Sequence, residues 1–388
     1  MSLVWAAPAQ RAFSDWQVTC NNQNFCVARN TGDHNGLVMT LSRSAGAHTD
    51  AVLRIERGGL KSPDASEGEI APRLLLDGEP LALSGDKWRI SPWLLVTDDT
   101  ATITAFLQMI QEGRAITLRD GNQTISLSGL KAALLFIDAQ QKRVGSETAW
   151  IKKGDEPPLS VPPAPALKEV AVVNPTPTPL SLEERNDLLD YGNWRMNGLR
   201  CSLDPLRREV NVTALTDDKA LMMISCEAGA YNTIDLAWIV SRKKPLASRP
   251  VRLRLPFNNG QETNELELMN ATFDEKSREL VTLAKGRGLS DCGIQARWRF
   301  DGQRFRLVRY AAEPTCDNWH GPDAWPTLWI MAGTCRPDKT RQRHIRQSAS
   351  CDHHQAPFTP STLCAFATIF SAVKPKNGNS LSAGADSP

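Results

Sequence analysis

The sequence predicts an α+β N-terminal domain, β-rich with two helices, followed by a mostly antiparallel β domain. Strand-like segments precede two helical patterns in the first part of the chain, a proline-rich segment interrupts it, and short period-two strands fill most of the remainder. The length of 388 residues fits two to three domains at about 150 residues each. We divide the chain into segments 1–12, 13–154, 155–180, 181–335 and 336–388.

The first domain begins with predicted strands. Residues 16–19 and 36–41 are rich in β-forming side chains, and residues 51–55 alternate most regularly between apolar and polar positions. This pattern predicts a sheet with one buried face.

Two helices follow these strands. Asp98 and Asp99 precede apolar residues spaced i, i+3, i+4 and i+7, and Gly113 follows them, which is the pattern of a capped amphipathic helix. The apolar stripes of the two helices are Ile103, Phe106, Leu107 and Ile110, and Leu130, Ala133, Leu134 and Ile137. Between the helices, residues 115–118 and 124–127 predict a hairpin turned at Asp120-Gly-Asn.

Residues 155–180 predict an extended linker. Eight prolines lie between positions 157 and 179, and proline at this density gives a semi-rigid spacer. Ser181 and Glu184 then match a capping box, so we expect a short helix to open the second domain.

The second domain is predicted as about eight antiparallel strands forming a sandwich, barrel or meander. Its strand segments are 210–215, 221–226, 234–240, 251–255, 266–273, 280–284, 293–300 and 305–310.

The two ends of the chain differ from the rest. Residues 1–12 resemble the end of a secretory signal peptide, with a disordered terminus as the alternative. Residues 336–388 show no clear period, and we expect them to be disordered. Cys335 and the cysteines and histidines of this tail (Cys351, His353, His354 and Cys364) match no zinc spacing, so we expect no metal site. No apolar run is long enough for a transmembrane helix.

The charge balance argues against a nucleic-acid partner. Lys and Arg total 45 against 43 Asp and Glu, for a net charge of +2. Non-specific binding to nucleic acid depends on a larger cationic excess.

Six of the nine cysteines form local pairs, Cys20 with Cys26, Cys201 with Cys226 and Cys292 with Cys316. No pair crosses the linker, which favours three disulfides in an oxidising compartment. Six reduced, buried cysteines are the alternative. The absence of Cys-x-x-Cys removes the basis for a thioredoxin-like activity.

The sequence carries no catalytic motif that we recognise. Gly-x-Ser-x-Gly, both phosphate-binding glycine motifs and His-Glu-x-x-His are absent, and Lys285-Gly-Arg-Gly reads as a basic turn. His320 lies in a loop-rich stretch, where we expect a surface histidine rather than a functional imidazole. We predict no cofactor and no metal.

The end of the second domain is rich in tryptophan and arginine. Trp298, Trp319, Trp325 and Trp329 offer either core packing or a platform for a sugar or peptide ligand. Arg297 and Arg299 share one strand face, and Arg304, Arg306 and Arg309 continue the alternation. A solvated cationic stripe is one interpretation, and recognition of an anionic glycan or phosphate is the other.

Two strings in the second domain resemble a known family. Residues 285–293 read Lys-Gly-Arg-Gly-Leu-Ser-Asp-Cys-Gly, and residues 325–329 read Trp-Pro-Thr-Leu-Trp. They resemble the bacterial exported family catalogued as domain of unknown function 1176. Residues 13–20 with Cys26, and residues 126–133, look like the N-terminal half of that family and also like the invasion-associated locus B proteins. The resemblance implies a periplasmic or envelope location and no catalytic residue.

This chain departs from the family pattern at both ends. The family implies a complete signal peptide and an end near residues 325–329, whereas residues 1–12 hold only part of such a signal and the chain continues to residue 388.

We therefore expect a periplasmic or secreted, disulfide-stabilised binding module for an envelope protein or a glycan. The alternative is a metal-independent hydrolase of a cell-wall or glycan substrate that uses a carboxylate pair, which sequence spacing does not reveal.

Overall fold

The computed structural model describes residues 7–32, 34–47, 50–58, 68–83, 86–119, 121–258 and 263–332. These residues form mostly β-sheets with three α-helices, and all belong to one compact unit, Met1–Thr340. Every pairing between their named strands is antiparallel, and none of these sheets closes into a barrel. The tail 336–388 and Cys335 lie outside the described residues.

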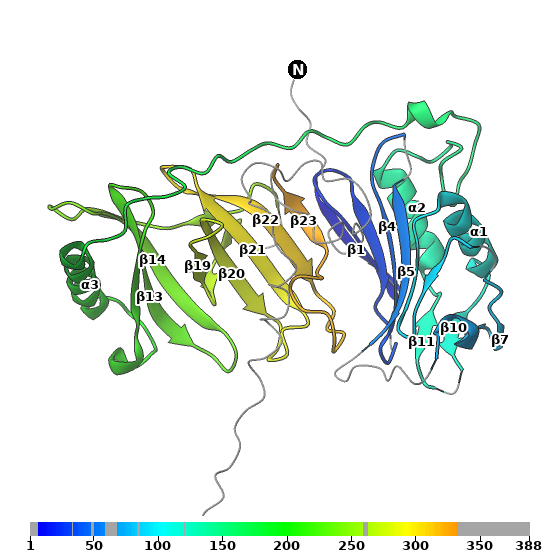
Figure 1. Ribbon diagram of the computed structural model, residues 1–388, viewed down its shortest axis with the longest axis horizontal. Coiled ribbons are helices and arrows are strands. Elements are labelled where there is room, and N and C mark those ends of the chain that lie inside the picture. The colour runs from blue at the N-terminus through cyan, green and yellow to red at the C-terminus, as the bar shows by residue number, and fades with distance from the viewer. Residues whose placement is uncertain are drawn as a thin grey trace, which may run out of the picture. The chain divides into compact units, whose positions relative to one another are not determined.

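Two sheets and two α-helices make up the described residues of the first part of the chain, which Figure 1 shows in blue to cyan. The larger sheet runs, in spatial order, β1 (Ala9–Phe13), β2 (Trp16–Cys20), β3 (Cys26–Asn30), β4 (Leu37–Arg43), β5 (Ala51–Arg57), β9 (Leu94–Thr97) and β8 (Arg89–Ile90). The smaller sheet runs β11 (Thr124–Ser126), β10 (Ala115–Leu118), β6 (Leu74–Leu76) and β7 (Glu79–Pro80). The hairpin predicted at 115–127 is thus confirmed, although Asp120 itself lies outside the described residues.

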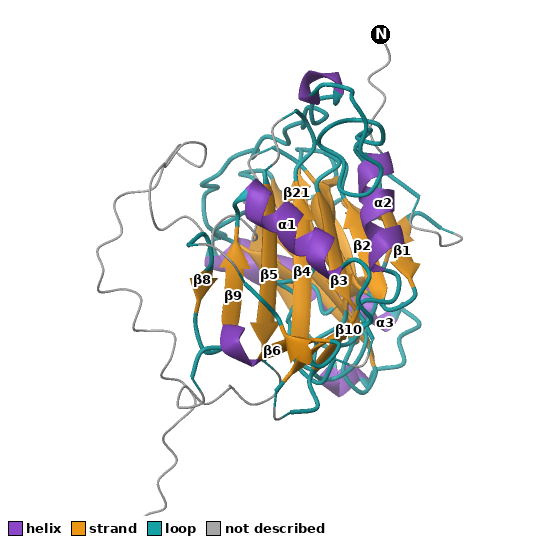
Figure 2. Cartoon of the chain, turned by 90° about the vertical axis from the view of Figure 1, so that its right-hand side faces the viewer, coloured by secondary structure: helices purple, strands orange, loops and turns teal. Residues whose placement is uncertain are grey.

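Helices α1 (Thr100–Ile110) and α2 (Leu130–Gln140) confirm the two predicted helices. They cover one face of the larger sheet, as Figure 2 shows. Asp99 caps α1 by accepting a hydrogen bond from the Thr102 amide at 2.8 Å. The predicted apolar stripes of both helices are buried in one cluster with the inner side chains of the sheet.

The ordered chain begins earlier than the sequence suggested. Residues 9–12, which we assigned to a leader or disordered segment, pair with β2 as part of strand β1. The alternation of small and polar residues there is too short to be recognised as a strand without its partner. Residues 9–12 therefore belong to the sheet.

The proline-rich segment has a 3-10 turn at Pro158–Ser160 and otherwise no helix or strand, and its second half lies against the second part of the chain. The Lys168 carbonyl accepts a hydrogen bond from the Ala332 amide, and the Val170 carbonyl accepts one from Arg299 at 2.9 Å. Arg242 donates to the carbonyls of Thr178 and Pro179. The linker is thus held along much of its length by specific hydrogen bonds.

The segment after the linker opens with α3 (Leu182–Asn197), whose predicted capping box is present. The Ser181 hydroxyl accepts from the Glu184 amide at 3.1 Å, and the Glu184 carboxylate accepts from the Ser181 amide at 2.8 Å.

Three sheets follow α3. The first runs β12 (Val210–Ala214), β13 (Lys219–Ala228), β14 (Thr233–Ser241) and β15 (Ser248–Pro250), with β18 (Leu268–Met269) also paired to β14. The second is β16 (Leu253–Arg254) with β17 (Glu265–Leu266). The third is a meander of β19 (Thr272–Asp274), β20 (Glu279–Lys285), β21 (Gly293–Phe300), β22 (Phe305–Glu313) and β23 (Thr327–Ile330) (Figure 1).

Two predicted strands are broken into shorter pieces. Residues 251–255 contribute only the two residues of β16, because Pro250 and Pro256 flank this stretch and lack an amide hydrogen for a ladder. Residues 266–273 contribute to three strands, because Asn270 adopts a left-handed φ of 43° between β18 and β19.

Three pairs of cysteines form disulfides, as predicted. Their Cα–Cα distances are 4.0 Å for Cys20–Cys26, 4.7 Å for Cys201–Cys226 and 4.6 Å for Cys292–Cys316. Each links neighbouring segments, and none crosses the linker.

Replacing both Cys201 and Cys226 by alanine is expected to lower the free energy of unfolding by up to about 3.5 kcal/mol, because this disulfide closes a long loop in the unfolded chain. Urea unfolding without reductant measures the change. An unchanged unfolding midpoint in the double variant would show that this cross-link contributes nothing to stability.

Candidate functional site

The four tryptophans proposed as a ligand platform lie mainly inside the protein. Trp298, Trp325 and Trp329 are 0%, 2% and 3% exposed, and Trp319 is half-buried. The ring of Trp329 stacks on Phe257 with centroids 5.6 Å apart. Three of the four rings are therefore covered by protein and offer no face to a ligand.

The two arginines proposed beside them are engaged in ion pairs. Arg297 and Arg299 lie on one face of β21, as expected, and both meet the buried Glu279 on β20, at 3.6 and 2.8 Å. Arg299 also holds the linker at Val170. Their charges serve the packing of the sheet and the linker rather than forming a free cationic stripe.

A different set of arginines lines a pocket in the second part of the chain. We call it the arginine pocket and define it by Arg249, Arg252, Arg254, Arg304 and Arg306. It has a volume of about 220 Å³, and Ile239, Pro250, Val251 and Phe305 supply its apolar lining. Sequence reasoning had noted Arg304 and Arg306 but missed the other three.

Four of these arginines point outward because side chains alternate between the two faces of a strand. In β16, Leu253 is buried while Arg252 and Arg254 on either side are exposed. At the start of β22, Phe305 is buried between the exposed Arg304 and Arg306 in the same way. Strands β16 and β22 contact one another, so the two arginine pairs line a common depression.

The turn before β22 fixes one side of the pocket. The Asp301 carboxylate accepts hydrogen bonds from the amides of Gln303 and Arg304 at 2.9 and 2.8 Å. Gly302 adopts a left-handed φ of 93°, which suits glycine at this turn. The Asp-Gly signal that predicted this turn therefore also positions the pocket arginines.

Two carboxylates partly neutralise the pocket. Glu265 lies 3.6 Å from Arg252 and 2.7 Å from Arg254, and Asp301 lies 2.6 Å from Arg306. The hydrogen bond from Arg254 is the main cause that lowers the pKa of Glu265, so this acid is ionised at neutral pH. Three of the five guanidinium groups are thus paired with these two carboxylates.

Arg249 and Arg304 are the uncompensated cations of the pocket. Among the residues that the structure describes, neither forms an ion pair. A guanidinium group binds carboxylate, phosphate or sulfate oxygens through two parallel N–H donors. The pocket therefore has the charge and the donors to hold an oxyanion above an apolar base.

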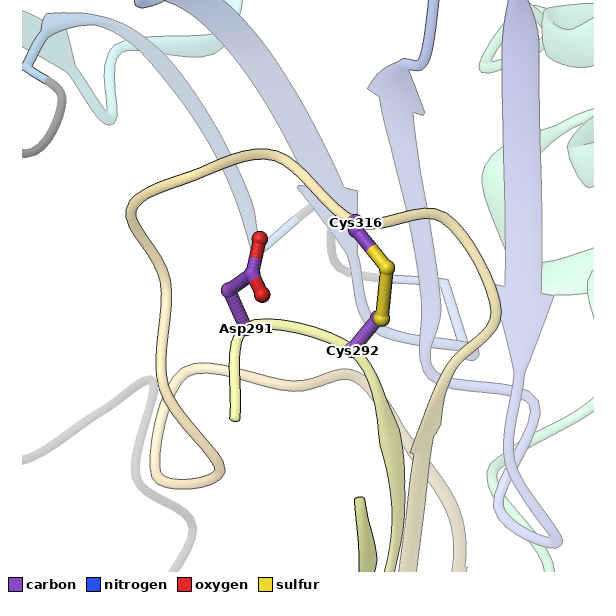
Figure 3. A group of neighbouring side chains, drawn as sticks. All are labelled: Asp291, Cys292 and Cys316. Carbon is purple, nitrogen blue, oxygen red and sulfur yellow. A yellow bond between two sulfur atoms is a disulfide. The ribbon is translucent and has the colours of Figure 1, made fainter. Parts of the chain in front are cut away.

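The structure also brings Asp291, Cys292 and Cys316 together, with ligand atoms within 4.8 Å of one another (Figure 3). Both sulfur atoms belong to a disulfide, so neither is a thiolate that could bind a metal. Arg287 pairs with the Asp291 carboxylate at 2.5 Å. These three residues form a structural group.

Glu313 and Asp317 are two neighbouring acids that are both buried. Burial raises the pKa of Glu313, whereas Asp317 has a lowered pKa because His320 and nearby amides outweigh its burial. Their side chains are only 2% and 6% exposed, and they already contact Arg29 and His320, respectively. A substrate does not reach them in this arrangement.

His320 differs most from its expected position. Its side chain is 11% exposed and lies against Glu56 of β5, not at the surface of a loop. The contact joins segments far apart in the sequence, so no local pattern could have revealed it.

Comparison with known proteins gives a family but no activity. The model of a family described as "Protein of unknown function (DUF1176)" matches residues 10–332. The chain is 99% identical over 329 residues to "Uncharacterized protein YpfG" of Escherichia coli (strain K12), which covers 85% of this chain and 95% of that protein. No solved structure matches the chain.

Proposed function

Since the chain belongs to the DUF1176 family of proteins of unknown function, we propose that it is a binding module whose arginine pocket holds an anionic group of a glycan. The observation that carries the proposal is the convergence of five arginines on one depression in which, among the described residues, two acids pair with them. Such an excess is costly through mutual repulsion unless an anion or solvent screens it.

The residues that line the arginine pocket indicate the chemistry of its ligand. Arg252, Arg254 and Arg306 are 63%, 64% and 46% exposed, so the rim of the pocket is open to water. Phe305 and Ile239 are buried beneath it and form an apolar base. A sugar ring that carries a carboxylate, phosphate or sulfate fits this combination, because its C–H face packs on the base while its oxyanion meets the rim.

The proposal places the protein in the bacterial envelope, exported to the periplasm or secreted. Three disulfides support it, since such bonds persist in oxidising compartments. Among the described residues, no helix is long and apolar enough to cross a membrane. The likeness of the N-terminal half to invasion-associated locus B proteins is part of this proposal, and the comparisons do not bear on it.

We also propose that residues 13–154 and 181–335 are separate folding domains joined by the linker 155–180. Separate hydrophobic clusters support this division. One cluster lies within residues 13–151, and two others lie within residues 170–331. Polar contacts such as Arg29 with Glu313 and Asn22 with the Ile330 carbonyl lie between the two parts, as is typical of interfaces between domains of one chain.

A matched pair of glycans tests the proposed function. Dextran sulfate and uncharged dextran share a backbone, so calorimetric titration of the full chain with each isolates the effect of charge. We expect binding of dextran sulfate alone, weakening several-fold between about 50 and 200 mM salt. Equal binding of both glycans, or binding of neither, would contradict the proposal, and a glycan cleaved during the titration would favour the hydrolase alternative.

A further inference from the structure

A cluster of charged side chains joins the two parts of the chain on the side of the larger sheet opposite its helices. We call it the clasp. Its six members are Arg29, Arg54, Glu56, Glu313, Asp317 and His320. The first three come from β3 and β5, and the last three come from the end of β22 and the loop 314–326. The clasp shares no residue with the arginine pocket.

His320 lies between carboxylates from both parts of the chain. Its Nδ1 atom hydrogen-bonds Asp317 of the same loop, and its Nε2 atom faces the Glu56 carboxylate of β5 at 3.9 Å. The neighbouring Trp319 ring lies 4.0 Å from the imidazole and packs on Gly58, where an added Cβ atom would overlap the indole. The imidazole is therefore fixed in the contact between the two parts.

A second ion pair lies beside it. Arg29 donates to Glu313 at 2.9 Å and to the Ala324 carbonyl at 3.2 Å, with side-chain exposures of 11% for Arg29 and 2% for Glu313. Gln17 of β2 also donates to Glu313, at 3.5 Å. These bonds connect the larger sheet to both ends of the loop 314–326.

Once Glu313 is ionised, the charge of the clasp depends on the proton of His320. With His320 protonated, three cations face three carboxylates and the cluster is neutral. With His320 neutral, one negative charge is left without compensation in a largely buried contact, which is costly. The nearby Arg287 and Asp291 pair with each other and so leave this balance unchanged.

We propose that protonated His320 closes the clasp between β5 and the loop 314–326, and that loss of its proton as the pH rises loosens this contact. The clasp then acts as a pH-sensitive connection between the two parts of the chain. The proposal is independent of the arginine pocket.

The pKa shifts set the pH window. Burial lowers the pKa of His320, but Asp317 and Glu56 outweigh it, so the net shift is upward. The stabilisation from His320 is thus complete below its ordinary pKa of 6.5 and is lost as the pH rises through the raised value. The raised pKa of Glu313 likewise makes the folded state less stable as the pH rises, but over a lower pH range, because the protonated acid is favoured in the fold.

The pKa values of Glu56 and Asp317 determine how far the pH can fall before the clasp loses their stabilisation. Burial alone would raise the pKa of Glu56, but the nearby His320 and Arg54 lower it to about 2. Asp317 is shifted down as well. Their stabilisation is present above their ordinary pKa values of 4.5 and 3.8 and is lost as the pH falls through the lowered ones. The clasp is therefore tightest at mildly acidic pH.

Hydrogen exchange of the full chain tests the proposal. Protection factors of residues 50–58 and 314–326, corrected for intrinsic exchange, are compared at about pH 5.5 and pH 8.5, on either side of the ordinary histidine pKa. We expect protection of both segments to fall several-fold at the higher pH while the strands of the cores keep theirs. No change in either segment would overturn the proposal.

Two variants assign the effect to His320. His320→Gln should give weak protection at both pH values, because glutamine mimics the neutral ring. Glu56→Gln removes the excess negative charge of the deprotonated state, so the pH dependence should weaken or reverse. His34→Gln, outside the clasp in the turn before β4, should behave as the wild type. A wild-type pH response retained in both His320→Gln and Glu56→Gln would contradict the proposal.

Discussion

Replacing Asp138 by asparagine is expected to lower the free energy of unfolding by about 3–5 kcal/mol, the cost of leaving a buried charge without its partner. Asp138 lies in α2 and pairs with Arg43 of β4 at 2.6 Å, and both side chains are completely buried. The same carboxylate accepts hydrogen bonds from the amides of Trp150 and Ile151. One acid thus fixes the helix, the sheet and the segment that leads to the linker.

The surroundings of Arg43 explain the size of the effect. Burial is the main cause that lowers its pKa to about 10, which still leaves it charged at neutral pH. Its guanidinium lies 3.6 Å from the centroid of the Trp150 ring and donates to Gln141 at 2.7 Å. These neutral partners stabilise the cation but do not replace the negative charge that asparagine lacks.

Urea unfolding followed by circular dichroism measures the loss. Lys131→Gln is the matched control, because it removes a charge from the same helix where Lys131 and Glu112 form an exposed ion pair. We expect the midpoint of Asp138→Asn to fall sharply and that of the control to stay near the wild type. Equal midpoints for both variants would show that the buried pair does not stabilise the fold.

Replacing Arg249 and Arg304 together by glutamine is expected to weaken binding of dextran sulfate about 100-fold. These are the two cations of the arginine pocket without an ion pair among the described residues. A hydrogen bond to a charged group contributes about 1.5 kcal/mol or more, which is about tenfold in affinity for each arginine. Both side chains are exposed, so the fold should be unaffected.

A control with the same change in net charge separates a local effect from a general one. Arg89→Gln combined with Lys131→Gln removes two exposed cations from the first part of the chain. Calorimetric titration should show affinity near the wild type for this control. If both double variants lose affinity equally, the anion responds to overall charge and the pocket is not its site.

The features predicted correctly from the sequence are mostly those determined by residues close together in the chain. The capping box at Ser181 and the Asp99 cap follow from side chains three residues apart, and both are present in the structure. The three disulfides join residues close in the chain, and local pairing found them. Helix caps and local disulfides can be predicted from a few neighbouring residues because only those residues form them.

The candidate site depended on contacts that local patterns do not contain. Arg254 and Arg306 line one pocket because β16 contacts β22, two strands some fifty positions apart in the numbering. Trp298 and Trp329 are covered by packing that their own strands do not specify. His320 is only 11% exposed because its loop reaches β5. Such placements follow only from the assembled sheets.

The most direct test of the account locates the bound anion. Hydrogen exchange of the full chain is measured with and without a dextran sulfate oligosaccharide at low salt. Binding at the arginine pocket predicts added protection in residues 248–255 and 303–306, with little change in the remaining strands. Protection centred elsewhere, on α3 or on the loop 314–326, with none at these two segments would contradict the claim that the arginine pocket is the ligand site.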